Sequence, residues 1–327
     1  MNSSNIVTIH LLSPRRGERI EVRGVRNPEH GFILIASLAV LSILAVLSME
    51  YSHLARNAAE RVRAAGDELA GFYAAESGVE RAKALIGADT GNLDSVGESW
   101  RDTSAYSKEL SGWRIAVRVT DEESKINLNT ADAAVLSKLF EQFGMNRQDR
   151  DVFVGSLLDW IDADDFHRTN GAEDDYYKSN GFLYGAKNAP LDSLEEISRI
   201  RGVPADLMTR SAKFGDATCL FSECVTVTGD TRVNINTAPA PVLVAIGFST
   251  DEVRALLKSR AKSPWSAISG ISPVVGTARF ESLRPLLRVS SASFFVESTA
   301  EREGSTPVSV FSILRRSPRR IYTAGFW

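Results

Sequence analysis

Histidine and cysteine are scarce in this chain of 327 residues, which has four histidines and two cysteines. Three of the histidines, His10, His30 and His53, lie in or beside an N-terminal segment that looks like a membrane anchor. Only His167 is therefore left for acid–base catalysis. Two cysteines cannot form a disulfide framework, and they are too few for a structural zinc site.

Catalytic signatures are missing as well. The sequence contains no GxSxG, Walker A or HExxH pattern. The formal net charge of −3 gives no general attraction to nucleic acid. We therefore expect a non-enzymatic protein. The competing hypothesis is a membrane-anchored hydrolase that uses acidic side chains, and it requires a cleft with a carboxylate of raised pKa.

One long uncharged run stands near the N-terminus. Residues 32–49 read FILIASLAVLSILAVLSM, and Glu50 ends the run. A helix of this length spans about 27 Å, close to the hydrocarbon thickness of a bilayer. The arginine-rich leader before it should stay in the cytoplasm. We predict a single-pass membrane protein whose large C-terminal part lies outside the cytoplasm.

Three other interpretations of this run are a secretory signal peptide, a plain signal anchor and a buried core helix. The run is longer than the apolar region of a usual signal peptide, and no clean A-x-A-like site follows it. It is also long for a core helix.

The junction Gly31–Phe32, at the end of a charged leader, resembles the processing site of type IV prepilins and pseudopilins. That resemblance implies that a prepilin peptidase cuts between Gly31 and Phe32 and that Phe32 is then N-methylated.

The helix is expected to continue beyond the membrane segment to residue 86. Residues 50–86 contain no proline and many helix-forming residues. Apolar residues recur every three or four positions, which predicts a stripe that packs on the soluble domain. The stripe consists of Val62, Ala65, Leu69, Phe72, Val79 and Ile86.

Alternating patterns predict an antiparallel sheet. Residues 112–120 place alternate apolar residues, from Trp113 to Val119, on one face. Residues 286–289, 294–299 and 308–314 are expected to form an antiparallel meander.

A short motif occurs twice, 107 positions apart. Residues 125–136 read KINLNTADAAVL and residues 232–243 read RVNINTAPAPVL, with seven of twelve positions identical. Such repetition indicates two copies of one local structure. We expect each copy to be a short strand followed by a helix that Thr130 or Thr237 caps. The repeated polar residues are Asn127, Asn129, Thr130, Asn234, Asn236 and Thr237.

Residues 131–215 are predicted to form an all-α insertion within a β-containing domain. The NxNTA motif resembles the start of helix-hairpin-helix modules in competence-type DNA-binding proteins. That resemblance implies the alternative function, a membrane-anchored helix-hairpin-helix DNA-binding protein of a competence or type IV pilus system. Residues 125–215 hold 15 acidic and 11 basic residues, which disfavours binding to a polyanion.

Seven acidic residues fall within residues 159–175, against a single arginine. Carboxylate oxygens at this density are suitable ligands for calcium, although their spacing does not fit an EF-hand loop. A solvated acidic loop is the alternative. The candidate calcium ligands are Asp159, Asp162, Asp164 and Glu173.

Cys219 and Cys224 are close enough in sequence to form one short-loop disulfide in an oxidising compartment. A pair of reduced, partly buried thiols is the alternative.

The order of motifs resembles the type II secretion system minor pseudopilin K family over most of residues 31–314. The motifs are Gly31-Phe32, DEESKINLNTA at 121–131, LLDWIDAD at 157–164, GAEDDYY at 171–177, KNAPL at 187–191 and NINTAP at 234–239. The resemblance implies a non-enzymatic subunit at the tip of the pseudopilus, acting in assembly initiation and in protein export through the outer membrane. It implies calcium as a ligand and, as partners, other minor pseudopilins, the prepilin peptidase and the inner membrane. No nucleic-acid partner is expected.

The fifth residue after the predicted cut is Ala36, where most pseudopilins have glutamate. In the family this glutamate pairs with the N-terminal amine of the subunit above. A tip subunit has no subunit above it, and an unpaired carboxylate in the bilayer is costly. A minor pilin of a true type IV pilus is a further alternative, which the large insertion disfavours.

The expected fold is α+β and pilin-like, with a long N-terminal transmembrane helix packed on an antiparallel sheet. It carries a large all-α, helix-hairpin-helix-like insertion. We divide the chain into a removed leader at 1–31, the helix at 32–86, a first pilin-like part at 87–130, the insertion at 131–215 and a second pilin-like part at 216–327.

Overall fold

The computed structural model describes residues 7–11, 20–24, 28–103, 108–317 and 320–326. The chain divides into two units, residues 1–67 and residues 68–327. Part of the predicted leader falls outside the described residues.

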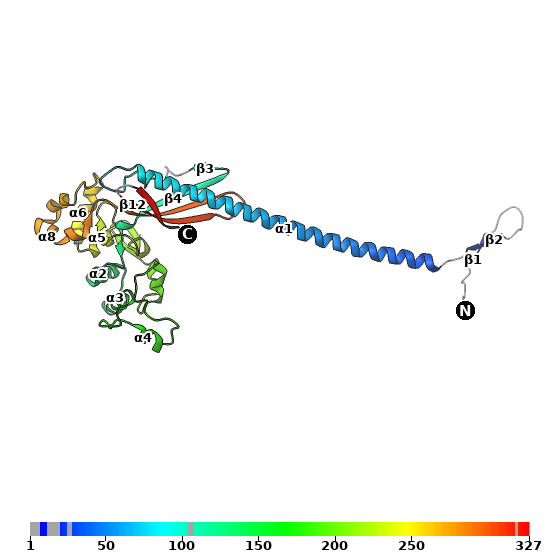
Figure 1. The fold of residues 1–327 in the computed structure, drawn as a ribbon, viewed down its shortest axis with the longest axis horizontal. Helices are drawn as coiled ribbons and strands as arrows, with labels where there is room; N and C mark the ends of the chain where they lie inside the picture. The colour runs from blue at the N-terminus through cyan, green and yellow to red at the C-terminus, as the bar shows by residue number, and fades with distance from the viewer. Residues whose placement is uncertain (1–6, 12–19, 25–27, 104–107, 318–319, 327) are drawn as a thin grey trace. The chain divides into compact units, whose positions relative to one another are not determined.

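The first unit holds a hairpin and the beginning of a long helix. Strands β1 (Val7–Leu11) and β2 (Ile20–Gly24) pair antiparallel. Helix α1 spans Pro28–Ala88 and so continues into the second unit (Figure 1). It begins at Pro28 rather than at the predicted Phe32, because proline is well suited to the first turn of a helix.

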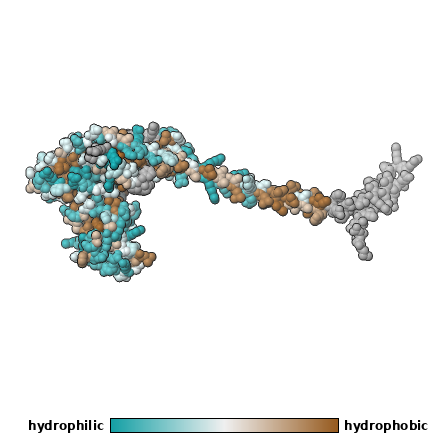
Figure 2. All heavy atoms as spheres, in the orientation of Figure 1, coloured by the Kyte–Doolittle hydropathy of each residue, from teal (hydrophilic) through white to brown (hydrophobic). Residues whose placement is uncertain are grey.

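Helix α1 contains the long apolar run. Among the described residues it is the one helix long and apolar enough to cross a membrane, with a mean hydropathy of 2.7 in its most apolar window. Figure 2 shows these apolar side chains gathered along the N-terminal part of the helix. The structure is therefore compatible with a single-pass anchor.

The second unit contains a five-stranded antiparallel sheet in the order β13–β12–β11–β4–β3. The strands are β3 (Lys108–Leu110), β4 (Trp113–Asp121), β11 (Ser293–Glu301), β12 (Val308–Ser317) and β13 (Arg320–Phe326). The patterns at 112–120, 294–299 and 308–314 predicted β4, β11 and β12. The expected strand at 286–289 does not join this meander, because β10 (Leu287–Arg288) pairs in parallel with β9 (Val233–Asn234).

The C-terminal part of α1 covers one face of this sheet (Figure 1). The approach is closest at Gly78, where a Cβ atom would lie 2.2 Å from Ser298 Oγ and 2.7 Å from Val117 Cγ2. The predicted apolar stripe is wrong in its first half, since Val62 and Leu69 are 73% and 55% exposed. The core contacts of α1 include Ala74, Ala75, Val79, Ala82 and Ile86.

A second hydrophobic core runs from Ile126 to Leu287 and is separate from the core of the sheet. We call residues 126–287 the helical domain, and residues 71–121 and 293–326 the sheet domain. The predicted borders at 131 and 215 are therefore corrected. Residues 216–287 belong to the helical core because the helices of the second repeat pack against those of the first. Helix α2 (Ala133–Gln142) lies next to α5 (Ala240–Ala245).

The helical domain is not all-α, since short strands alternate with its helices. Its α-helices are α2 (Ala133–Gln142), α3 (Arg147–Ile161), α4 (Asp174–Ser179), α5 (Ala240–Ala245), α6 (Thr250–Arg260), α7 (Ser272–Val275) and α8 (Thr277–Leu283). Its strands besides β9 and β10 are β5 (Ile126–Asn127), β6 (Ser211–Phe214), β7 (Ala217–Leu220) and β8 (Val225–Thr226). The 3-10 helices of the second unit include η2 (Glu122–Ser124), η3 (Leu194–Arg199), η4 (Leu207–Thr209), η5 (Phe221–Glu223), η6 (Ile268–Ile271) and η7 (Arg284–Leu286).

Candidate functional site

The two copies of the repeated motif have the same local structure. Strand β5 pairs in parallel with β8, and β9 pairs in parallel with β10. The side chain of Asn127 accepts a hydrogen bond from the backbone N–H of Asn129 at 3.0 Å. Asn234 accepts one from the N–H of Asn236 at the same distance. Each motif therefore ends its strand in an Asx turn.

The second asparagine of each copy binds two distant backbone segments. Asn129 donates to the carbonyls of Leu191 and Val227 at 3.0 Å and accepts from the N–H of Leu191 at 2.7 Å. Asn236 repeats this arrangement with Trp265 and Val289. These bonds assign the repeat a structural role.

The threonines of the repeat are not helix caps, which corrects that prediction. The N-cap of α2 is Asp132, whose side chain accepts from the N–H of Val135 at 2.8 Å. Helix α5 begins after Pro239. The helices start later than expected because the turn first closes back on the strand, with Ala131 donating to the carbonyl of Asn127 at 3.0 Å.

A buried polar cluster joins the sheet domain to the helical domain. The Asp121 carboxylate accepts hydrogen bonds from Ser291 Oγ at 2.6 Å, Thr237 Oγ1 at 2.5 Å and Asn234 Nδ2 at 3.1 Å. Asp121 is fully buried, and this burial raises its pKa. Thr237 thus contacts the sheet domain instead of capping a helix.

Arg316 and Glu123 add further polar contacts to this buried cluster between the two domains. Arg316 forms an ion pair with buried Asp94 and another with Asp89 at 3.1 Å. Glu123 Oε2 accepts from the backbone N–H groups of Ala292 and Ser293 at 3.1 and 2.9 Å. Burial, followed by the charge of Asp121, raises the pKa of Glu123 to about 7.

Three of the four predicted calcium ligands come together after α3. Ligand oxygens of Asp162, Asp164 and Glu173 lie within 4.8 Å of one another. Glu173 is 1% exposed, and neither of its carboxylate oxygens has a hydrogen-bond partner among the described residues. Burial, followed by the charges of Asp159 and Asp162, raises the pKa of Glu173 to about 7. A buried carboxylate without a donor is a natural ligand for a cation.

Asp159, the fourth predicted ligand, lies outside the three residues whose ligand oxygens come within 4.8 Å of one another. Its carboxylate accepts from Arg168 Nη1 at 2.9 Å. It lies so close to Gly171 that a Cβ atom there would be 1.9 Å from Asp159 Oδ2. Arg168 also pairs with Asp162.

Asn188 was not found from the sequence. Its Nδ2 donates to Asp165 at 3.0 Å, while its Oδ1 is buried and has no partner among the described residues. Asn188 also has a positive φ of 50°, a conformation that asparagine tolerates better than most residues. Asn188 lies in the KNAPL motif at 187–191. Nothing in that motif indicated that the side-chain oxygen of Asn188 would have no hydrogen-bond partner among the described residues.

The predicted cysteine pair is brought together. The Sγ atoms of Cys219 and Cys224 are 3.0 Å apart; Cys219 is half-buried, and Cys224 is buried.

At the N-terminal end, Gly31 and Phe32 of the predicted processing site lie within α1, and Phe32 is 74% exposed.

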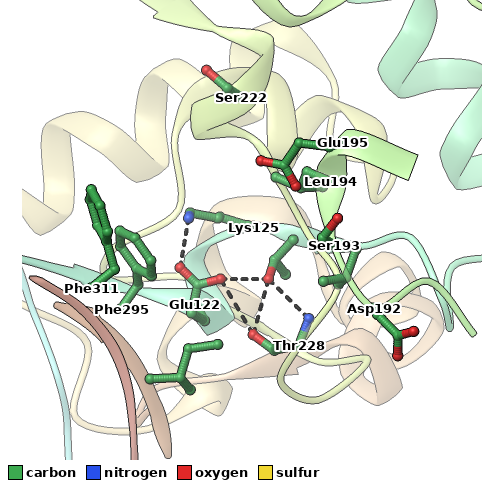
Figure 3. A pocket seen from close by; sticks show the side chains of 13 residues that line it. Glu122, Lys125, Asp192, Ser193, Leu194, Glu195, Ser222, Thr228, Phe295 and Phe311 are labelled. Carbon is green, nitrogen blue, oxygen red and sulfur yellow. Dashed lines mark hydrogen bonds and ion pairs between the residues drawn. The ribbon is translucent and has the colours of Figure 1, made fainter. Parts of the chain in front are cut away.

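A cavity of about 590 Å³ opens between the sheet domain and the helical domain (Figure 3). On one side Phe295 and Phe311 stack with their ring centroids 6.1 Å apart. Beside these rings Glu122 pairs with Lys125 at 2.6 Å, and Lys125 Nζ lies 5.9 Å from the centroid of the Phe295 ring. The carboxylates of raised pKa described above, at Asp121, Glu123 and Glu173, do not line this cavity.

Comparison with known proteins gives a consistent result. Two family profiles described as type II secretion system protein K match residues 115–214 and 233–283. The type II secretion system protein K of Klebsiella pneumoniae is 25% identical over 83% of this chain and 87% of its own length. The putative protein K of Escherichia coli K12 is 24% identical over 78% of this chain and 85% of its own length.

The fold agrees with a solved structure. A chain in the crystal structure of the GspK-GspI-GspJ complex from enterotoxigenic Escherichia coli superposes with a TM-score of 0.68 at 18% identity. The match covers 82% of this chain and 98% of that chain. These matches give no support to the DNA-binding alternative. The chain is thus similar to type II secretion system protein K in sequence and in fold, and these matches support a minor pseudopilin of the type II secretion system.

Proposed function

We propose that this minor pseudopilin is a non-enzymatic subunit at the tip of the pseudopilus. It acts in assembly initiation and in protein export through the outer membrane. Its partners are other minor pseudopilins, as in the solved GspK-GspI-GspJ complex. It is anchored in the inner membrane, with the C-terminal domain in the periplasm.

The observation that carries this proposal is the exposed apolar surface of α1. Beyond the membrane-length run, Leu54, Val62 and Leu69 are 66%, 73% and 55% exposed. An apolar helix surface of this kind is costly in water and is typical of an interaction site. Helices of neighbouring pseudopilins are the partners of matching chemistry. Ala36 supports the tip position, because it leaves no carboxylate that needs a subunit above.

Processing by the prepilin peptidase is the first test. Co-expression of the full chain with the peptidase should give a mature protein that starts at N-methylated Phe32, measured by intact mass and N-terminal sequencing. Gly31→Leu should block the cut, because a large side chain would stand at the cleaved bond.

Gly66→Leu is the matched control, since a Cβ at Gly66 meets no atom within 4 Å. It should be processed like the parent chain. A chain that stays uncut, or that is cut behind residue 49, would contradict the proposed class of anchor.

We also propose that calcium binds at Asp162, Asp164 and Glu173. Hard carboxylate oxygens are the ligands that calcium prefers, and Glu173 has no other described partner for its buried charge. Bound calcium supplies positive charge that offsets these carboxylates. The three residues would then hold the segment between α3 and α4 in place.

Calcium should raise the melting temperature of the protein over a sample in chelator. At a calcium concentration 100 times the dissociation constant the gain is about 2.7 kcal/mol, or several degrees. Glu173→Gln and Asp162→Asn should reduce this gain. Asp151→Asn, on the exposed side of α3, is the control and should keep it. An equal calcium response in all four proteins would exclude this site.

A further inference from the structure

Backbone hydrogen bonds hold the two cysteines in place. Cys219 lies in β7, where its register partner is Ala212 of β6. Cys224 donates its N–H to the carbonyl of Phe221 at 2.9 Å and accepts from the N–H of Ile126 at 2.9 Å. With the Sγ atoms 3.0 Å apart, closure to the usual S–S length of about 2.05 Å needs only a small side-chain movement.

The two thiols differ in access. Cys219 lines an open cavity of about 450 Å³, whereas Cys224 is 0% exposed. The hydrogen bond with Cys219, followed by burial, raises the pKa of Cys224. Cations and carboxylates both line this cavity. The charged lining residues are Arg101, Arg118, Lys125, Glu223 and Glu297.

We propose that Cys219 and Cys224 form a disulfide by exchange with an external disulfide, and that Cys219 reacts first. The Cys219 thiolate attacks one sulfur of the oxidant and breaks its S–S bond, and the released oxidant thiolate takes up a proton. Cys224 then loses its proton and attacks the Cys219 sulfur, which releases the second oxidant thiol. Two protein thiols are oxidised and one external disulfide is reduced to two thiols.

The bond would fasten the start of the helical domain. It closes a ring around η5 and so ties the β6–β7 hairpin to β8. Strand β8 pairs with β5, the first strand of the helical domain. The disulfide therefore constrains the segment through which the chain enters this domain from the sheet. The inference rests on the proposed periplasmic placement only for the source of the oxidant.

The test uses the full chain in detergent, equilibrated with reduced and oxidised glutathione in varying ratio. Free thiols are trapped with N-ethylmaleimide under denaturing conditions and counted by intact mass. Oxidised glutathione should abolish labelling of both cysteines. It should also raise the melting temperature on the order of 5 °C above that of the reduced chain. Two cysteines that remain labelled in excess oxidised glutathione would overturn the proposal.

Single variants test the order of reaction. Cys224→Ser leaves the accessible thiol and should accumulate a mixed disulfide with glutathione at Cys219. Cys219→Ser leaves the buried thiol and should stay unmodified while folded. Neither variant should gain thermal stability from oxidised glutathione. Faster modification of Cys219→Ser would overturn the assigned order.

A measurement in cells separates this inference from the proposed function. Acid-quenched cells producing the full chain are labelled in the same way. A closed pair supports both the disulfide and the periplasmic placement. A pair that closes in glutathione but is fully labelled in cells supports the bond chemistry and contradicts the placement of the C-terminal domain.

Discussion

Glu123 makes the stability of the contact between the sheet domain and the helical domain depend on pH. Its pKa in the folded protein is about 7, above the ordinary value of 4.5, because it is buried beside Asp121. The folded chain therefore binds this proton more tightly than the unfolded chain does. The stabilisation from the proton is fully present below about pH 4.5 and is lost as the pH rises through about 7.

Glu123→Gln should flatten this part of the pH dependence. Glutamine keeps an oxygen that accepts from Ala292 and Ser293 but carries no charge. Urea unfolding at pH 5 and pH 8 in chelator should show a smaller loss of stability in the variant, by on the order of 3 kcal/mol. Glu281→Gln, an exposed change on α8, should behave like the parent chain. An unchanged difference between the two pH values would contradict the assignment.

Residue-level roles were only partly predictable from the sequence. The repeat showed that Asn129 and Asn236 do the same task. Their partners, such as Leu191 and Trp265, lie 62 and 29 positions away and become neighbours only through packing. In the same way, a dense run of acids predicted Asp162, Asp164 and Glu173. Composition could not show that Arg168 pairs with both Asp159 and Asp162, since that depends on where the loop turns.

Among the elements, α1 depends on close contact with the sheet. Gly78 permits this contact because a side chain there would overlap Ser298 and Val117. Gly66 lies in the same helix, and a Cβ there meets nothing within 4 Å. The two glycines therefore form a matched pair, since the helix gains the same propensity from alanine at either position.

Gly78→Ala should destabilise the protein by about 1–3 kcal/mol, because the helix and sheet must separate to admit the methyl group. Gly66→Ala should instead be neutral or stabilise by up to about 1 kcal/mol. Urea midpoints of the two variants, measured side by side, check this. The idea fails if both substitutions shift the midpoint in the same direction by the same amount.

Strong periodicity made some elements predictable. Strict alternation identified β4, and the apolar run with its long proline-free extension identified α1. Strand β13 was not predicted from the sequence. The C-terminal border of the helical domain was also predicted at the wrong place. Residues 216–287 carry short apolar runs that suit either core, and only packing decides which one they join.

For the whole molecule, the second unit should fold without the first. The core residues of the sheet domain begin at Ala74, and those of the helical domain begin at Ile126. A fragment of residues 68–327 should remain in solution without detergent and unfold cooperatively, close to the midpoint of the full chain.

A fragment that begins at residue 83 is the control. It lacks Ala74, Ala75, Val79 and Ala82, which cover the sheet, and it should aggregate or unfold at a much lower temperature. Circular dichroism melts of both fragments check this. Equal stability of the two fragments would show that α1 contributes little to the sheet core.

The helical domain leaves the sheet after Asp121 and returns at Ser293, and Asp121 and Phe294 are paired neighbours on β4 and β11. Both of its connections are therefore anchored at almost one point. A pull or push along α1 would load the helix–sheet contact directly, without stretching the helical core between two distant attachment points. The helical domain is thus held at one end of the sheet, and the sheet domain would bear a force applied along α1.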